Sequence, residues 1–298
     1  AWSYYVGASY KFSDNDKIEL FAIGAPQRHG QNLYRQNIAR YDQDFALSLD
    51  DYDPAAAQRY GEYGRRFNQN YTTVDPSYSG LQYYDMYGGA PADLTRYDRN
   101  SIMERENFFH KPQVNLNWYH NFSDKVRWTN VAYWSGGRGG GTGTFGSVSS
   151  LPPTFRRDWD SEIAQNSNNI DPNIDPNLNR STGILRNSRN NQWTLGLLSK
   201  LYMEVNDNFD LIVGVDARTA EIEHYREVRD LLGGDYYYYT GNDFDTQTSD
   251  YMKMLGDKID YWNTNTVSWL GGYAQGMWDL GNLSLNAMAG FTSIGYSF

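Results

Sequence analysis

Apolar and polar residues alternate along this chain with a period of two, in four pairs of segments, each pair joined by a short polar turn. Such alternation places successive side chains on opposite faces of a β-strand. The pairs are 2–12 with 17–25, 113–122 with 126–135, 192–205 with 209–218, and 264–278 with 283–298. The pattern therefore predicts an all-β chain of about eight antiparallel strands.

Three long connections separate the four pairs, at Pro26–Pro112, Gly136–Asn190 and Arg229–Asn263. Structureless connections of this length are unusual in a compact soluble domain. A strict alternation of short and long connections is typical of a transmembrane β-barrel, which has short periplasmic turns and long extracellular loops. The spacing therefore favours an antiparallel transmembrane β-barrel segment. A soluble antiparallel sandwich would also alternate and remains the alternative fold.

Composition excludes several classes of function. The net charge of -10 argues against a nucleic-acid partner, because such binding depends on Lys and Arg neutralising phosphates. There is no cysteine, and the four histidines lack metal-ligand spacing, so we expect no metal site and no cofactor. No Ser/His/Asp arrangement is defensible, so we predict that the protein is not an enzyme. No apolar run is long enough for a membrane helix.

Aromatic residues make up 16% of the chain, and several of them lie near the ends of the predicted strands. Trp and Tyr gather at the two membrane interfaces of a barrel, where they form girdles. The residues expected in such girdles are Trp2, Phe12, Trp118, Phe122, Trp193 and Phe209.

The third hairpin gives the sharpest prediction of faces, since its alternation is unbroken. One face is expected to contact lipid and the other the lumen, because a one-residue step reverses the side. The lipid-facing set is Leu195, Leu197, Leu201, Val213 and Val215. The lumen-facing set is Lys200, Glu204, Asp216 and Arg218.

Parity of the connections predicts where the two chain ends lie. A short turn comes first and a short turn comes last, so eight strands begin and end on the side of the long loops. The first and eighth strands are then expected to have free edges. Residues 1–298 are accordingly interpreted as a partial barrel domain that lacks the remaining strands. A closed eight-stranded barrel is the alternative.

Four local motifs have two interpretations each. Gly136–Thr144 lacks the lysine of a phosphate-binding loop and is expected to be a flexible exit from a strand. Asp53–Tyr60 predicts a short helix. The Asp-Pro-Asn repeat in Asn169–Asn177 fits Asx-turns, with calcium binding as the alternative. Glu221–Arg229 resembles a solvated ion-pair ladder, with a two-carboxylate hydrolytic site as the alternative.

The third long connection carries the candidate ligand-binding residues. Four consecutive tyrosines, flanked by acidic residues, suit stacking on a sugar or a chelate. The candidate set is Tyr236, Tyr237, Tyr238, Tyr239, Asp243 and Asp245. Packing within the loop is the alternative role for the same residues.

Several stretches resemble TonB-dependent receptors of the Bacteroidetes type. These stretches are 2–12, 23–31, 104–122, 136–146, 218–235 and 263–272. The resemblance implies an internal part of the barrel of an outer-membrane transporter with a plugged lumen. It further implies the TonB complex as a partner acting through the missing plug, and a surface lipoprotein as another partner.

We therefore expect ligand capture and import across the bacterial outer membrane, with outer-membrane lipid around the barrel. The ligand is a small molecule, a glycan or a peptide. A secreted sugar-binding β domain and a passive porin-like or structural barrel are the alternative functions. Dependence on detergent distinguishes the receptor from the secreted domain, because a lipid-facing apolar band needs detergent. An open pore would favour the porin-like barrel.

Overall fold

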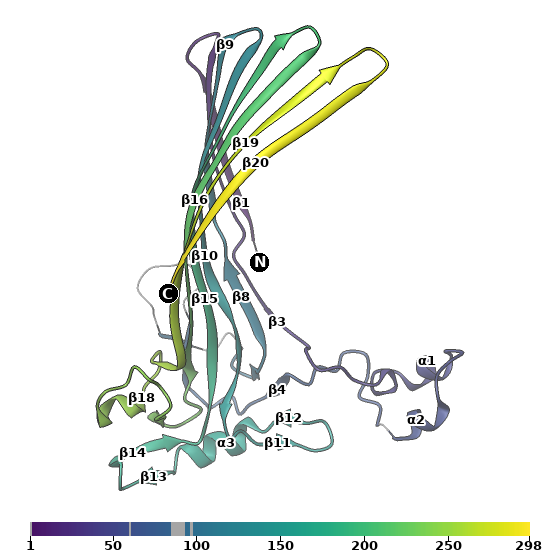
Figure 1. Ribbon diagram of the computed structural model, residues 1–298. Coiled ribbons are helices and arrows are strands. Elements are labelled where there is room, and N and C mark those ends of the chain that lie inside the picture. The colour runs from purple at the N-terminus through teal and green to yellow at the C-terminus, as the bar shows by residue number, and fades with distance from the viewer. Residues whose placement is uncertain (1, 60, 85–92, 96–97) are drawn as a thin grey trace.

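The computed structural model describes residues 2–59, 61–84, 93–95 and 98–298. Its main element is a single antiparallel sheet with eight strands along its path, as the alternation predicts. Neighbouring strands in this sheet are consecutive in the chain, apart from the insertions between them (Figure 1). In spatial order they are β1 (Tyr4–Lys11), β2 (Asp16–Gly24), β9 (Gln113–Ser123), β10 (Val126–Gly146), β15 (Gly183–Asn206), β16 (Phe209–Asp230), β19 (Lys258–Asp279) and β20 (Ser284–Ser297).

All four hairpin turns lie at one end of the sheet (Figure 1). Each turn contains the same kind of local hydrogen bond. A Ser, Asn or Asp side chain accepts a hydrogen bond from the backbone N–H two residues later, as in Asx- and ST-turns. The accepting side chains are Ser13, Ser123, Asn206 and Asp279. In the last turn Gly281 has φ +83°, a left-handed conformation that glycine adopts without strain.

The strands extend much further toward the long connections than the alternation predicts. β10 runs to Gly146 and β15 starts at Gly183, so Gly136–Thr144 is strand and its prediction as a flexible exit is wrong. The glycines serve close approach of neighbouring strands. A Cβ on Gly139 would meet the backbone of Phe108, and a Cβ on Gly140 would meet the backbone of Ser188. A run of glycines is typical of a loop, but inside a strand it marks a place where another backbone approaches closely.

Two prolines break the first two central strands at the same level. β2 ends at Gly24 before Pro26 and is continued by β3 (Gln27–Gly30), while Pro112 separates β9 from β8 (Glu106–His110). Proline has no N–H to donate to a ladder, so such breaks fall where pairing is interrupted. Beyond the break β8 pairs with both β3 and β10, so the sheet continues toward the loops.

The long connections fold into small units. These comprise η1 (Ile38–Arg40), α1 (Gln43–Leu47), α2 (Pro54–Arg59), β4 (Tyr71–Thr73), β5 (Leu81–Tyr83), β6 (Asp93–Thr95), β7 (Ser101–Met103), β11 (Ser150–Leu151), β12 (Arg156–Arg157), α3 (Trp159–Asn166), β13 (Ile170–Asp171), β14 (Asp175–Ser181), β17 (Tyr236–Tyr238), η2 (Thr248–Tyr251) and β18 (Met252–Lys253). The predicted helix at Asp53–Tyr60 is confirmed as α2, although Tyr60 lies outside the described residues.

These units cover both faces of the sheet at its loop-side end. Leu185 packs with Trp159, Ile102 and Leu232, whereas its neighbour Ile184 packs with Val228 and Ile259 in a separate cluster. Adjacent strand residues point to opposite faces, so the two clusters lie on opposite sides of β15. The apolar cores of the described chain therefore lie among the long connections and not over the strands near the turns.

The sheet is open at both edges. β1 and β20 are its outermost strands and do not pair with each other, which confirms the predicted free edges. Both edge strands have their chain-terminal ends away from the hairpin turns. The described residues thus form an all-β, antiparallel fold without barrel closure. No helix in the described ranges is both long and apolar enough to cross a membrane.

Candidate functional site

The two faces of the central strands differ in character. Directly paired residues share a face, and on one face Leu197 lies between Ala132 and Ala217, while Leu201 lies between Trp128 and Val213. On β16 and β19 the same face carries Val215, Ala217 and Leu270. We call this surface, between Leu195 and Val205 on β15 and across the paired residues of its neighbours, the apolar band.

No described segment covers the apolar band. Leu195 is 54% exposed, Leu197 45%, Val215 45% and Leu270 49%. The sequence-predicted set Leu195, Leu197, Leu201, Val213 and Val215 lies on this face, because Leu201 pairs with Val213 and Leu197 pairs with Ala217. A contiguous apolar surface of this extent is not typical of a soluble monomer, where such patches mark contact with a partner or a membrane.

Aromatic residues flank the apolar band at both ends. On the loop side Trp134 and Trp193 occupy neighbouring rows of β10 and β15. On the turn side the rings of Trp118 and Trp128 contact each other in a tilted arrangement, with 5.0 Å between centroids, and Phe209 stacks on Trp278 at 4.7 Å. Trp118, Trp193 and Phe209 were predicted as girdle residues from sequence, whereas Trp134 and Trp128 were not.

The opposite face of the central strands carries charged and hydroxyl-bearing side chains. Here Lys200 lies opposite Thr129 and Gly214, and Arg218 contacts Asp216 at 3.5 Å. The Arg218 guanidinium also lies 4.5 Å from the ring centre of Trp269. We call this surface the polar face. The polar face holds all four residues predicted to face a lumen. Glu204 is separated from Lys200 on β15, and Asp216 from Arg218 on β16, by an even number of positions, so each pair points to the same side.

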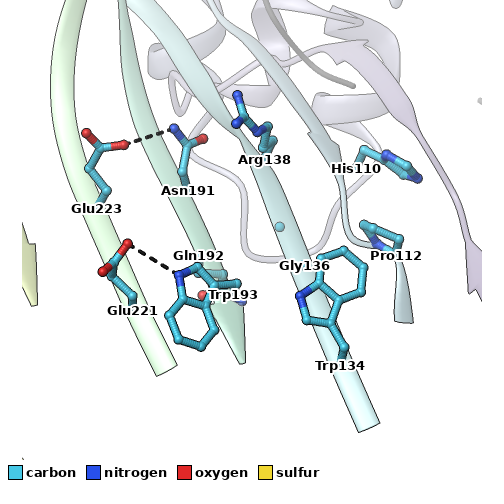
Figure 2. Close-up of a pocket in the computed structure, with 11 residues that line it drawn as sticks. His110, Pro112, Trp134, Gly136, Arg138, Asn191, Gln192, Trp193, Glu221 and Glu223 are labelled. Carbon is cyan, nitrogen blue, oxygen red and sulfur yellow. Dashed lines mark hydrogen bonds between the residues drawn. The ribbon is translucent and has the colours of Figure 1, made fainter. Parts of the chain in front are cut away.

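A pocket of about 450 Å³ opens at the loop-side end of the apolar band (Figure 2). Trp134 and Trp193 form part of its wall, with Arg138, Glu221 and Glu223 beyond them. Trp193 Nε1 donates a hydrogen bond to Glu221 at 3.3 Å. Glu223 accepts hydrogen bonds from Asn191 at 3.4 Å and from Lys258 Nζ at 3.0 Å. The pocket places charged groups directly beside the aromatic boundary of the band.

The predicted tyrosine run is mostly engaged in packing. Tyr236 has no exposed surface, and Tyr237 and Tyr239 make edge contacts with Phe145 at centroid distances of 5.8 and 5.4 Å. Tyr238 contacts Tyr251 and lies under the Arg180 guanidinium. Burial raises the pKa of the Tyr237 hydroxyl.

The two predicted aspartates lie in different surroundings. Asp245 forms an enclosed ion pair with Lys253 Nζ at 2.7 Å and accepts a hydrogen bond from Asn242, whereas Asp243 is exposed. The structure therefore brings Tyr237 and Tyr239 together with Phe145, while Asp245 is engaged by Lys253, the residue paired with Tyr237 across β17 and β18. Direct contact of any of these six residues with a ligand stays a prediction.

The ion-pair ladder expected in Glu221–Arg229 is not solvated along its length. Arg229 is 1% exposed and pairs with Glu106, and Glu227 pairs with the buried Arg189. Burial lowers the pKa of the Arg229 guanidinium and raises that of the neighbouring Asp230 carboxyl, which Leu232, Tyr78 and Gln82 hydrogen-bond. These charges are buried because the first long connection packs over them, which alternation in the sequence does not reveal.

The Asp-Pro-Asn repeat forms Asx-turns. The Asp171 side chain accepts the N–H of Asn173 at 3.2 Å, and that of Asp175 accepts the N–H of Asn177 at 2.8 Å. The remaining Asp171 oxygen pairs with Arg180. In the part of the chain that the structure describes, no group of three or more His, Asp or Glu side chains is placed to hold a metal ion.

Comparison of the chain with known family models and with curated proteins gives no match. The features that bear on function are the two faces of the sheet and the residues gathered where the strands meet the loops.

Proposed function

We propose that this chain forms an arc of a β-barrel in the bacterial outer membrane, as part of a TonB-dependent receptor that binds an extracellular ligand and imports it. The observation that carries the proposal is the uncovered apolar band. It spans Leu195–Val205 on β15, which matches the 9–11 residues that a tilted strand needs to cross a bilayer. Aromatic residues at both of its ends fit the girdles of such a barrel.

The polar face then lines the interior. Alternation of apolar-out and polar-in residues is the pattern of a membrane barrel, and the charged residues Lys200, Asp216 and Arg218 would be costly against lipid. The four tight turns then lie on the periplasmic side, and the long connections lie outside. Their folded units would form the surface that a ligand meets first.

The open edges of the sheet require further strands. Unpaired N–H and C=O groups of β1 and β20 cannot remain in hydrocarbon, since each unsatisfied group costs several kcal/mol. We therefore infer that other strands complete the barrel. A transporter with a plugged lumen is the completion implied by the resemblance to TonB-dependent receptors, and import would then depend on the TonB complex.

The test uses single cysteines, because the chain has none of its own. Nitroxide labels at positions 197 and 215 of the intact protein in lipid vesicles are expected to collide with dissolved oxygen, which concentrates in hydrocarbon. Labels at the control positions 200 and 216, which lie on the same two strands but on the opposite face, are expected to collide with a water-soluble nickel chelate. Equal nickel accessibility at all four positions would contradict membrane insertion and favour a secreted β domain.

A second measurement separates a receptor from a passive pore. Uptake of a ligand through the intact protein is expected to stop when the proton gradient is collapsed, because TonB transmits energy from the inner membrane. Uptake that continues without the gradient, together with steady ion conductance, would favour the porin-like alternative.

A further inference from the structure

Three arginines converge at the loop-side end of the polar face. Arg105 precedes β8, Arg186 is in β15 and Arg226 is in β16, and we call them the arginine cluster. Arg186 pairs with Gly143 on β10, and terminal nitrogens of Arg105 and Arg186 occupy the space above that glycine. The Arg186 Nη2 atom lies 3.0 Å from where a Gly143 Cβ would be. The absence of a side chain at 143 thus lets two guanidinium groups meet.

Among the described residues, Arg186 has no acidic partner. Its hydrogen bonds go to Ser188 Oγ at 2.7 Å and to the Gly141 carbonyl at 3.3 Å, which are both neutral. No ion pair joins Arg186 to a carboxylate within the described ranges of the chain, and its Nε is buried without an acceptor. Burial, with the nearby charges of Arg226 and Arg105, lowers the pKa of Arg186 to about 10.

The carboxylates around the cluster do not balance its charge. Asp260 pairs with Arg226 at 2.5 Å. Glu104 is shared, because it contacts Arg157 at 3.0 Å and Arg105 only at 3.8 Å. Four guanidinium groups therefore face two carboxylates in a half-buried place. Like charges that are partly removed from water repel one another strongly, so this arrangement is costly until an anion joins it.

An aromatic wall stands beside the cluster. The Arg226 guanidinium lies 5.1 Å from the ring centre of Tyr261 and 5.9 Å from that of Phe145. Phe145 in turn contacts Tyr237 and Tyr239. These rings hold Arg226 by cation–π contact and shield one side of the cluster from water.

Asp260 is held in a strained conformation that orients Arg226. Its φ of +69° is unusual for a residue other than glycine, and it lies where a bulge shifts the register of β19 against β16. The Asp260 N–H donates to Asn242 Oδ1 at 2.6 Å, which fixes the bulge. Strain of this kind persists when surrounding contacts determine it, and it is frequent at ligand sites.

We propose that the arginine cluster binds a small ligand that carries at least two oxyanion groups, either carboxylates or phosphates. The planar guanidinium fork matches both groups in two-point contact. Arg186 and Arg105 supply the donors, Arg226 supplies further positive charge, and the ligand offsets the repulsion among them. The proposal deepens the proposed receptor function by naming its ligand class, and it rests on that function for the route by which the ligand arrives.

Binding is tested with citrate and, separately, pyrophosphate, by isothermal titration of the intact protein at low ionic strength. Arg186→Gln is expected to weaken citrate binding by about 10-fold or more, since a charge-assisted contact is lost. Arg186→Lys is expected to retain part of the affinity. The matched control is Arg138→Gln, which removes an arginine from the other face of the sheet and is expected to leave affinity within about 2-fold.

A protection experiment keeps the test independent of how the variants fold. Phenylglyoxal modifies accessible arginines, and bound citrate is expected to slow modification of Arg105 and Arg186 but not of Arg138. Equal affinity in the Arg186→Gln and Arg138→Gln variants, or no protection by either anion, would overturn the proposal and make the cluster purely structural. Citrate binding without lipid insertion of the labels at 197 and 215 would instead overturn the receptor function and leave the anion site in place.

Discussion

Placing a charge in the apolar band gives the sharpest test of what covers it. Val213 lies midway along the band, opposite Leu201 on one neighbouring strand and Ala274 on the other, and is 38% exposed. If hydrocarbon covers this face, Val213→Arg costs about 2–4 kcal/mol of the free energy of unfolding, as for Arg near a bilayer midplane. If water covers it, a surface substitution costs only about 0.5 kcal/mol or less.

The assay is equilibrium unfolding in urea of the intact protein inserted in vesicles. The matched control is Ile212→Arg, one residue away on the polar face, where Tyr202 and Gln275 are its paired neighbours. We expect this control to cost less than half as much as Val213→Arg, because its charge enters a polar interior. Equal costs for the two variants would refute the two-face reasoning.

Four further predictions concern the loop-side half of the molecule. In the same urea titration, Gly140→Ala is expected to lower the free energy of unfolding by about 1–3 kcal/mol, because the added Cβ meets the Ser188 carbonyl oxygen. Gly141→Ala is the control, since the nearest atom to its added Cβ lies at 3.5 Å. Tyr236→Ala is expected to cost about 3–5 kcal/mol, whereas Tyr236→Phe should leave thermal stability unchanged or raised, because the buried hydroxyl has no hydrogen-bond partner in the part of the chain that the structure describes. Glu106→Gln is expected to destabilise by about 3–5 kcal/mol in chemical unfolding by leaving Arg229 buried without its partner, and a small effect would mean that water reaches Arg229. Hydrogen bonds from the backbone N–H groups of Thr246 and Gln247 hold the pKa of the Asp250 carboxyl below 3.8. The stabilisation that these bonds give the loop is therefore present above pH 3.8 and is lost as the pH falls through the lowered pKa. Hydrogen exchange of the two amides measures the loss: we expect it to become faster in acid, and we expect no such change in Asp250→Asn.

The strand pattern was predictable because each hairpin has a period of two and a turn that closes locally. Leu195–Val205 alternates except at Leu198 and Ser199, and Asn206 and Asn208 mark the turn beside it. The ends of the strands were not predictable in the same way. β10 continues through Gly136–Gly146, and its glycines are needed by β8 and β15, which lie far from them in sequence.

The arginine cluster could not be found from sequence. Arg105, Arg186 and Arg226 are separated by dozens of residues, and only the pairing of β8, β10, β15 and β16 brings them to one place. The tyrosine run was conspicuous as a sequence motif, yet Tyr236 faces a core. A local pattern reports the face of a strand well, whereas convergence of charges depends on register across several strands.

The length of the central strands sets how far the long connections stand from the apolar band. β15 has 24 residues, and only Leu195–Val205 lies in the apolar band. At a rise of about 3.4 Å per residue and a tilt of about 40°, the part before Leu195 would reach roughly 30 Å beyond the hydrocarbon edge. If the band lies in a bilayer, as we propose, the extended strands would hold the folded units of the long connections clear of the headgroups, so that even a large ligand could reach them.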